Sequence, residues 1–407
     1  MARALPSVLA ILLLWAAGVG AAGQFAKIAV PFPEVQMLYP EAAGRQGWLL
    51  SSISLVGALL GIVAGRLVGR LGTARVLYAG LLGGAAISLW QATGLAFPTL
   101  LASRLLEGGA HLAIVVAAPT LMLQIAPARL QGAAMALWST FFGVSFALAA
   151  WLGLPLVAAF GPRALFLAHG LLMLAIALLL ATVLRRARLD GRGAEEPARP
   201  GPALLAAHLR AYRSPFIAAP GIGWLFYTMT FVALLAILPE RLPEGQRQSL
   251  TALLPLLGIA VSLLVAPLLL RIMGGTTIVV AGFALAAAAI ASLAFGASLT
   301  LVCLALFPVL GLVQSGSFAA VPELNGNLAD RALSHGVMAQ TGNIGNLLGT
   351  PALQAVLRGG GEAGLFTAVV GLYGAGIAAH LFLRRQRIRT GRLTPRPDTR
   401  PGPDSPG

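Results

Sequence analysis

The chain is dominated by apolar stretches of about 20 residues, the length a helix needs to cross the hydrocarbon core of a membrane. A transmembrane barrel would instead show alternating segments of about ten residues, and the sequence contains no such segments. The pattern predicts an all-α polytopic membrane protein with about twelve transmembrane helices. The apolar windows fall at 6–30, 47–66, 75–94, 97–125, 132–157, 164–184, 216–238, 250–270, 276–296, 299–321, 333–356 and 364–383.

Composition excludes a water-soluble fold of this length. The 407 residues are 58% apolar and only 10% charged, whereas soluble domains carry about 25% charged residues. The net charge of +15 comes from arginines in the short gaps between apolar runs. We therefore expect membrane lipids, and no nucleic acid, as partners. The single cysteine, Cys303, excludes a disulfide framework.

Arginine placement orients the chain. If the N-terminus is cytoplasmic, the gaps on the same side contain most of the arginines, and the opposite gaps contain few. This bias predicts that both termini are cytoplasmic and that the protein is multi-pass in the cell (inner or plasma) membrane. Residues 1–23 resemble a secretion signal, but the apolar run continues past them, so we interpret them as part of an uncleaved first helix.

The first and second halves of the sequence contain similar residues at similar spacings. Gly108 precedes Pro119 in the fourth window as Gly311 precedes Pro322 in the tenth. Several such pairs recur at offsets of 201 to 204 residues, which predicts two six-helix halves related by an axis along the membrane normal. The expected order is an N-terminal half at 1–184, a cytoplasmic linker at 185–215, a C-terminal half at 216–383 and a disordered basic, Pro-rich cytoplasmic tail at 384–407.

The stretch "GRLVGRLGTAR" at 65–75 joins the second and third windows. It resembles the loop signature of the major facilitator superfamily between helices two and three, a Gly-x-Leu-x-Asp-Arg-x-Gly-Arg-Arg pattern. The usual acid is Gly69 here, which puts the associated latch between the halves in doubt. We expect a cytoplasmic conformational-switch loop whose matching and basic positions are Gly65, Leu67, Arg70, Gly72 and Arg75.

Two further motifs are similar to that superfamily. "SRLLEGGA" at 103–110 resembles its fourth-helix pattern, and "GPRALF" at 161–166 resembles the start of its sixth helix. The fifth-helix Gly-x-x-x-Gly-Pro pattern of drug–proton antiporters is missing from 143–153, which disfavours drug efflux. The resemblance implies an MFS fold, with a central cavity lined by helices one, four, seven and ten.

Ionisable residues inside the apolar windows are candidate functional residues, because a charge in the bilayer is costly. Arg104, Glu107 and His111 share one helical face, with an Arg–Glu pair that either functions in transport or merely anchors the helix. Lys27 either extends to the outer interface or reaches into a cavity. His169 is interpreted as a hydrogen-bonded structural histidine.

Polar and aromatic faces supply the remaining candidates. Gln340 and Asn343 belong to a polar stripe in the eleventh window, which suits either helix packing or cavity lining. Trp224 and Tyr227 share a face in the seventh window, and Gln314 lies in the tenth. If the lining helices of the superfamily apply, the candidates that face the central cavity are Lys27, Arg104, Trp224, Tyr227 and Gln314.

The sequence therefore predicts a secondary active transporter that works by alternating access. The expected substrate is a small organic solute of anionic or aromatic character. We expect the transporter to be a monomer, and to act as a symporter if transport is coupled to protons. Glu107 is then the expected proton carrier. No Walker loop, metal-ligand cluster or nucleophile elbow is present, so we expect no enzyme activity, no cofactor and no metal. An efflux transporter of the same fold and a non-transporting polytopic sensor or assembly protein remain open as alternatives.

Overall fold

The computed structural model describes residues 4–127, 131–187, 204–243, 245–326 and 328–391, and within these ranges the regular structure is entirely helical. The first part of the chain contains α1 (Ala4–Ala29), α2 (Phe32–Met37), η1 (Pro40–Ala42), α3 (Trp48–Ser51), η2 (Ser52–Ser54), α4 (Leu55–Leu71), α5 (Thr73–Ala92), α6 (Phe97–Ile125), α7 (Gln131–Ser139), α8 (Phe141–Leu148), η4 (Ala149–Gly153), α9 (Leu154–Phe160) and α10 (Pro162–Ala187).

The second part contains α11 (Leu204–Arg213), α12 (Ala218–Ile237), η5 (Leu238–Arg241), α13 (Arg247–Ala260), η6 (Val261–Val265), α14 (Ala266–Leu269), α15 (Gly275–Ala291), η7 (Ser292–Phe295), α16 (Leu299–Leu324) and α17 (Leu328–Arg389). The helix α17 is kinked at Gly361, whose φ of 61° and ψ of −161° are not helical. Two helices therefore follow one another inside α17.

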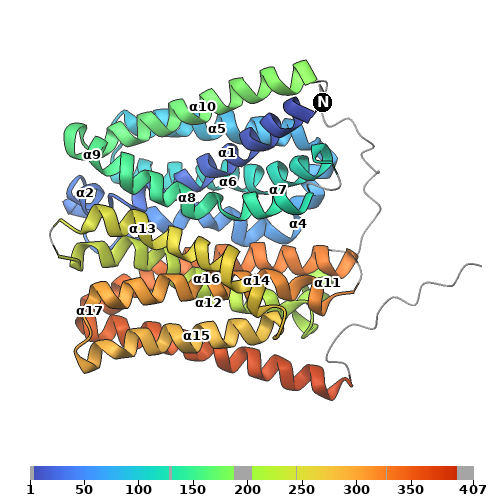
Figure 1. Ribbon diagram of the computed structural model, residues 1–407. Helices are drawn as coiled ribbons and strands as arrows, with labels where there is room; N and C mark the ends of the chain where they lie inside the picture. The colour runs from blue at the N-terminus through green and yellow to red at the C-terminus, as the bar shows by residue number, and fades with distance from the viewer. Residues whose placement is uncertain (1–3, 128–130, 188–203, 244, 327, 392–407) are drawn as a thin grey trace, which may run out of the picture.

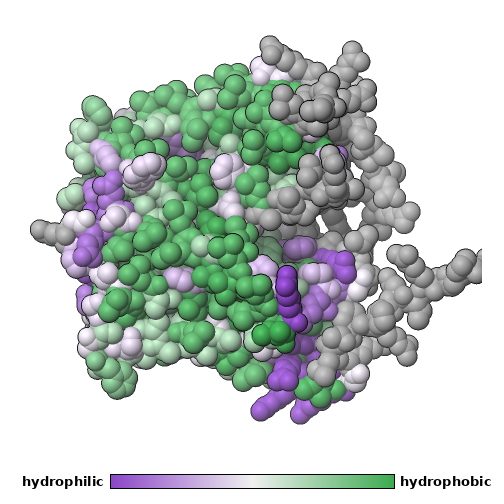
Figure 2. Space-filling view, in the orientation of Figure 1, coloured by the Kyte–Doolittle hydropathy of each residue, from purple (hydrophilic) through white to green (hydrophobic). Residues whose placement is uncertain are grey.

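Ten helices in the described part of the chain are long and apolar enough to cross a membrane. A shorter apolar helix covers Trp48–Gly61. Figure 2 shows hydrophobic residues over most of the visible face, with hydrophilic residues gathered toward its two ends. This distribution is the one expected of a helical bundle whose sides face lipid and whose ends face water.

The helices run roughly side by side in Figure 1, with α1 to α10 in its upper part and α11 to α17 in its lower part. The N-terminus and the end of α17 both lie at the right-hand end of the bundle. One buried apolar cluster belongs to the upper helices alone and includes Leu14, Leu81 and Leu121. Another contains residues of both parts, such as Phe146 and Phe231.

Glycines at matched positions bring backbones together in the two parts. A Cβ atom at Gly108 of α6 would collide with the carbonyl oxygen of Ile53, and one at Gly311 of α16 would collide with that of Gly258. Gly108 and Gly311 are 203 positions apart. Only a residue without a side chain permits this approach of one helix to another.

The expected switch loop is much shorter than the sequence indicated. The helix α4 continues to Leu71 and α5 begins at Thr73, so Gly72 is the only residue between them. Its φ of 90° is open to glycine and strained for other residues, and it reverses the chain in a single step. Gly65 and Arg70 therefore belong to α4, although their side chains lie outside the described part, and Arg75 is an exposed residue of α5.

The segments expected to lie outside the membrane also differ from the prediction. Within the expected linker, residues 188–203 are outside the described part, while α11 forms a short helix directly after them. The expected tail begins later than residue 384, because α17 continues to Arg389. The Arg387 Nη1 atom donates to the Pro215 carbonyl at 2.9 Å, which ties the end of α17 to the segment between α11 and α12. Residues 392–407 lie outside the described part.

Candidate functional site

A cluster of buried charges lies inside the first part of the chain, between α1, α5, α6 and α10. Glu107 of α6 is bonded by two cations, one at each carboxylate oxygen. The Lys27 Nζ atom of α1 lies 2.6 Å from Glu107 Oε1, and Arg104 Nη1 donates to Glu107 Oε2. All three side chains are at most 1% exposed. The predicted Arg–Glu pair is therefore present, with Lys27 as a second cation.

Polar side chains of α5 and α6 complete the hydrogen bonds of this cluster. Lys27 also donates to Ser88 Oγ and, at 2.6 Å, to Gln91 Oε1, so its ammonium group has three acceptors. Gln91 Nε2 donates to Glu107 Oε2 at 3.0 Å and to Ser103 Oγ at 2.9 Å. Hydrogen bonds of this kind make the burial of ionised groups tolerable.

Arg104 joins three helices through its guanidinium group. Its Nε atom donates to the Leu49 carbonyl of α3 at 2.8 Å, and its Nη2 atom donates to the Gln24 carbonyl of α1 at 2.7 Å. With Glu107 as its third partner, Arg104 makes all three of these hydrogen bonds within the first part of the chain.

Two histidines border the cluster without joining its ion pairs. His169 of α10 has Nε2 at 2.8 Å from the Gly20 carbonyl and Nδ1 at 2.7 Å from Ser88 Oγ. Because a carbonyl only accepts, Nε2 carries the proton and Nδ1 accepts from Ser88 in the neutral ring. His111 Nδ1 contacts the Ala21 carbonyl at 3.0 Å, so the expected proton sharing between His111 and Glu107 is not part of this geometry.

Aromatic rings extend from this cluster to the second part of the chain. Phe25 of α1 touches the His111 ring edge-on at 5.1 Å between centroids and lies 5.8 Å from Phe142 of α8. Phe142 in turn lies 6.4 Å from Phe231 of α12. Phe231 stacks on Tyr227 at 5.1 Å, and Tyr227 stacks on Trp224 at 4.7 Å. This aromatic chain, from Phe25 to Trp224, crosses from one part of the molecule to the other.

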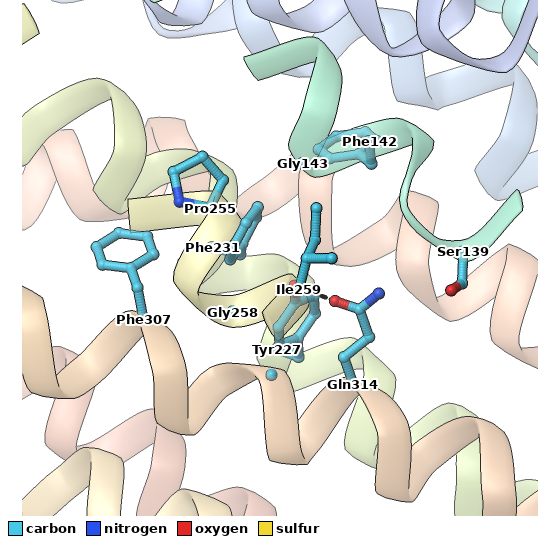
Figure 3. Close-up of a pocket in the computed structure, with 11 residues that line it drawn as sticks. Ser139, Phe142, Gly143, Tyr227, Phe231, Pro255, Gly258, Ile259, Phe307 and Gln314 are labelled. Atoms are coloured by element: carbon cyan, nitrogen blue, oxygen red, sulfur yellow. Dashed lines mark hydrogen bonds between the residues drawn. The ribbon is translucent and has the colours of Figure 1, made fainter. Parts of the chain in front are cut away.

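A small cavity lies beside the aromatic chain, between α7, α8, α12, α13 and α16 (Figure 3). Its volume of about 20 Å³ is close to that of one water-sized sphere. Tyr227 donates its hydroxyl to Gln314 Oε1 at 3.2 Å, and Figure 3 shows the Gln314 amide nitrogen on the side away from Tyr227. The lining contains no charged side chain: Ser139, Phe142, Gly143, Tyr227, Phe231, Pro255, Gly258, Ile259, Phe307, Gly311 and Gln314.

Contacts between the two parts of the chain close one end of the bundle. Arg247 of α13 makes a two-pronged ion pair with Glu34 of α2, at 2.9 and 3.0 Å. Gln248 Nε2 donates to the Trp151 carbonyl at 3.2 Å. Figure 1 shows α2 and the start of α13 at the end of the bundle opposite the N-terminus. A solute the size of an amino acid has no room in the cavity until helices on its two sides separate.

Comparison with known families identifies the fold. A family model described as Major Facilitator Superfamily matches residues 14–352, more than four fifths of the chain. The chain belongs to the major facilitator superfamily. It is accordingly a multi-pass membrane transporter of that superfamily, whose members are transporters rather than enzymes. None of the curated proteins compared with the chain matches it.

In this superfamily member the predicted candidates fall into three places. Lys27, Arg104 and Glu107 form the buried charge cluster and do not line the cavity. Tyr227 and Gln314 line the cavity, and Trp224 stacks on Tyr227. His111 borders the charge cluster, and Gln340 and Asn343 lie where α17 packs against α4.

The polar stripe of α17 makes packing contacts between the two parts of the transporter. Gln340 Nε2 donates to the Ala58 carbonyl of α4 at 2.9 Å, and Tyr212 donates its hydroxyl to Gln340 Oε1 at 2.8 Å. Asn343 donates to the Ala339 carbonyl of its own helix and contacts Gly57 of α4. These contacts favour helix packing over cavity lining for this stripe.

Several residues of the transporter's site escaped prediction. Ser88 and Gln91 stand three positions apart on α5 and bond Lys27, and Phe25 begins the aromatic chain that crosses the molecule. The spacing of Ser88 and Gln91 in an apolar window was an available signal of a buried polar face. Nothing in the sequence indicated which distant partners Phe25 and Phe142 have.

Proposed function

We propose that the protein is a secondary active transporter that moves a small organic solute by alternating access. The observation that carries this proposal is the uncharged aromatic cavity between the two parts of the chain, too small to hold a solute in this conformation. Transporters of this design bind substrate near the membrane midplane and expose the site by rocking one bundle against the other. The closed end formed by Glu34 and Arg247 fits such a cycle.

The proposed topology has twelve spans, two six-helix halves and both termini in the cytoplasm of a cell membrane. Ten helices qualify directly. The broken segment of α3, η2 and α4 supplies one further span, and the kink at Gly361 divides α17 into two. The halves correspond to residues 1–184 and 216–383. The arginine bias between spans supports the orientation.

The proposed substrate carries an aromatic ring and a hydrogen-bond acceptor but no charge. Stacked rings of Trp224, Tyr227 and Phe231 offer planar surfaces beside the cavity. Gln314 offers an amide donor there. An anionic substrate is less favoured, because the buried cations Lys27 and Arg104 are already bonded to Glu107 and to neighbouring acceptors.

We propose proton coupling through the charge cluster. Lys27, Glu107 and Arg104 belong to spans that the aromatic chain connects to the cavity through Phe25 and Phe142. A change of charge in the cluster would alter the packing of α1 and α6, and hence the cavity. Proton binding at the cluster would then change the affinity of the cavity for the solute, and solute binding would change the proton affinity of the cluster by the same factor.

A set of probes with the same ring and different charge tests the substrate proposal. Purified protein is heated with benzamide, benzoate or benzylamine, and with cyclohexanecarboxamide as the non-aromatic comparison. We expect benzamide to raise the unfolding midpoint most, because a ligand that binds only the folded state stabilises it. Stabilisation by benzoate alone would contradict an uncharged aromatic substrate and favour an anion.

Two variants connect the binding to the cavity. Gln314→Leu removes the amide donor and is expected to weaken benzamide binding about fivefold to tenfold, the value of one hydrogen bond. Thr182→Val is the matched control, because Thr182 is exposed and bonds only its own helix through the Leu179 carbonyl. Equal effects of the two substitutions would mean that benzamide binds elsewhere.

Counterflow distinguishes a transporter from a polytopic sensor. Proteoliposomes loaded with unlabelled benzamide are diluted into labelled benzamide, and a transporter accumulates the label transiently. Binding without counterflow would favour the non-transporting alternative. Oriented vesicles that concentrate the label inward or outward under a pH difference then separate uptake from efflux.

A further inference from the structure

The protein contains a single lysine. Lys27 stands against 27 arginines among the 28 basic residues, and it is buried inside the bundle with 1% of its surface exposed. Every other cationic position of the chain uses arginine. Arginine stays protonated in proteins, whereas lysine exchanges its proton readily in a buried setting. The single lysine, which releases its proton more readily than any of the arginines, therefore lies in the charge cluster.

The balance of charge in the cluster points to the same residue. Lys27, Arg104 and Glu107 together carry two positive charges and one negative charge in a closed, low-dielectric space. Adding a proton to Glu107 would leave both cations without a counter-ion. Removing a proton from Lys27 would leave the Arg104–Glu107 pair, which is neutral overall and keeps the hydrogen bond from Gln91 to Glu107 Oε2.

We propose that Lys27 is the group that takes up and releases the coupled proton, with Glu107 as its fixed counter-ion. This inference rests on the proposed proton-coupled transport and assigns its carrier to a residue other than the expected Glu107. Protonated, Lys27 bonds α1 to Ser88 and Gln91 of α5 and to Glu107 of α6. Deprotonated, it loses its charge-assisted bonds and loosens α1 from those two helices.

The groups around Lys27 limit where its proton goes. On α6 it faces Glu107, with Arg104 and His111 nearby, and α10 contributes His169. The contacts from α5 are Ser88 and Gln91, which do not titrate. Arg104 has no acceptor for a proton, and His111 uses its ring nitrogen Nδ1 on the Ala21 carbonyl.

Ser88 and His169 form a route for the proton. Lys27 donates to Ser88 Oγ, and Ser88 donates its own hydroxyl proton to His169 Nδ1 at 2.7 Å. Passing one proton along this pair leaves Lys27 as a neutral amine, Ser88 unchanged and His169 as an imidazolium. His169 then releases the proton to water when the bundle opens, and the cluster is left neutral. The reverse sequence reloads Lys27.

The lone lysine allows its protonation state to be observed directly. Protein labelled with ¹³Cε-lysine in lipid nanodiscs gives one side-chain signal from the whole chain. We expect this signal to move from its ammonium to its amine position over the pH interval in which proton-driven transport changes. A signal that stays in the ammonium position at every pH where the protein remains folded would overturn the inference, without any need for a ligand.

Three variants separate Lys27 from Glu107 as the carrier. Lys27→Arg keeps the positive charge but removes the releasable proton, so benzamide counterflow should persist. Accumulation of benzamide under a pH difference should fall to the level measured when no pH difference is applied. Lys27→Met should behave likewise. Ser88→Ala keeps Lys27 and should slow the proton flux without abolishing the accumulation finally reached. Full pH-driven accumulation by Lys27→Arg would refute the assignment.

The readouts also separate this inference from the transport proposal. Proteoliposomes that enclose the pH dye pyranine report proton movement when benzamide is added. Benzamide counterflow without proton movement, together with an ammonium signal that never moves, would defeat the role of Lys27 and leave transport standing. Absence of counterflow for every probe would defeat the proposed substrate, while the titration of the lysine signal still decides the carrier.

Discussion

The two halves of the transporter share their backbone contacts and differ in what those contacts surround. Gly108 and Gly311, 203 positions apart, each hold their helix against a backbone carbonyl of a neighbour. At the same offset, Lys27, Arg104 and Glu107 correspond to Thr230, Phe307 and Leu310. The first half therefore encloses charges where the second encloses apolar and hydroxyl groups.

The corresponding place in the second half is held by rings and one hydroxyl pair. Tyr373 donates to Thr230 Oγ1 at 3.2 Å and stacks on Phe283 at 5.4 Å between centroids. Phe307 lines the cavity and touches Phe231 at 5.8 Å. All of these side chains are buried. The comparison teaches that the same glycine-mediated helix contact borders buried charges in one half and buried rings in the other.

The largest expected difference between the halves is in the cost of losing a matched residue. Glu107→Leu leaves Lys27 and Arg104 without their counter-ion and should lower the free energy of unfolding by about 3–5 kcal/mol. Leu310→Met conserves volume at the equivalent place and should cost under about 1.5 kcal/mol. Chemical unfolding in detergent micelles measures both. Equal losses would mean that the cluster is solvated or its charges are neutralised.

The next effect tests whether the two glycine contacts are equivalent. Gly108→Ala and Gly311→Ala each push a methyl group into a carbonyl oxygen and should each cost about 1–3 kcal/mol. Gly109→Ala is the control, because a Cβ there meets nothing within 4 Å, and it should stabilise the helix by about 0.5–1 kcal/mol. Unequal losses of stability at Gly108 and Gly311 would show that the two positions match in sequence but are not equivalent in the folded protein.

An effect of similar size is expected at Gly72, the single residue between α4 and α5. Gly72→Val forces a branched side chain to a φ of 90°, at a cost of about 1–3 kcal/mol. We expect slower transport with nearly unchanged benzamide affinity, because Gly72 is far from the cavity. The equivalent Gly274 has a φ of −72°, so Gly274→Ala carries no such backbone strain. Weaker binding at normal speed in Gly72→Val would contradict a role in switching.

The smallest expected effect concerns the ion pair that joins the halves. Glu34 and Arg247 are partly exposed, at 24% and 29% of their side-chain surface, so the pair is worth about 1 kcal/mol or less. Glu34→Gln should change the counterflow rate by no more than about fivefold. The exchanged pair Glu34→Arg with Arg247→Glu should return the rate toward that of the unchanged protein. Failure of the exchange to do so would mean that the two charges act separately.

Much of the architecture was predictable from local patterns. Apolar windows marked the spans, because the thickness of a bilayer sets the length of an apolar helix. The spacing of Arg104 and Glu107 placed both on one face of a helix, and the pair is present. Residue spacing also indicated that Gly108 and Gly311 occupy matching positions. The carbonyl groups that they approach could not be predicted from the sequence.

The partners of the site residues came from the tertiary structure. Lys27 lies near the end of α1, where either an interfacial or a buried position is compatible with the sequence. Its burial follows from Ser88, Gln91 and Glu107, which belong to helices 61 to 80 residues away. Likewise, the sequence indicated a loop over residues 65–75, whereas in the structure Gly72 alone separates α4 from α5.

The sequence by itself determined a polytopic helical membrane protein, because hydrophobic length is a property of the chain alone, and its motifs resemble those of a transporter superfamily. Only the tertiary structure decided that the cations lie in a closed cluster and that rings and an amide line the cavity. The physical reason is that a helical period specifies which residues share a face but not which helix that face meets. Which helix it meets depends on long-range packing, such as the contact of Phe25 with Phe142 that links the charge cluster to the aromatic cavity.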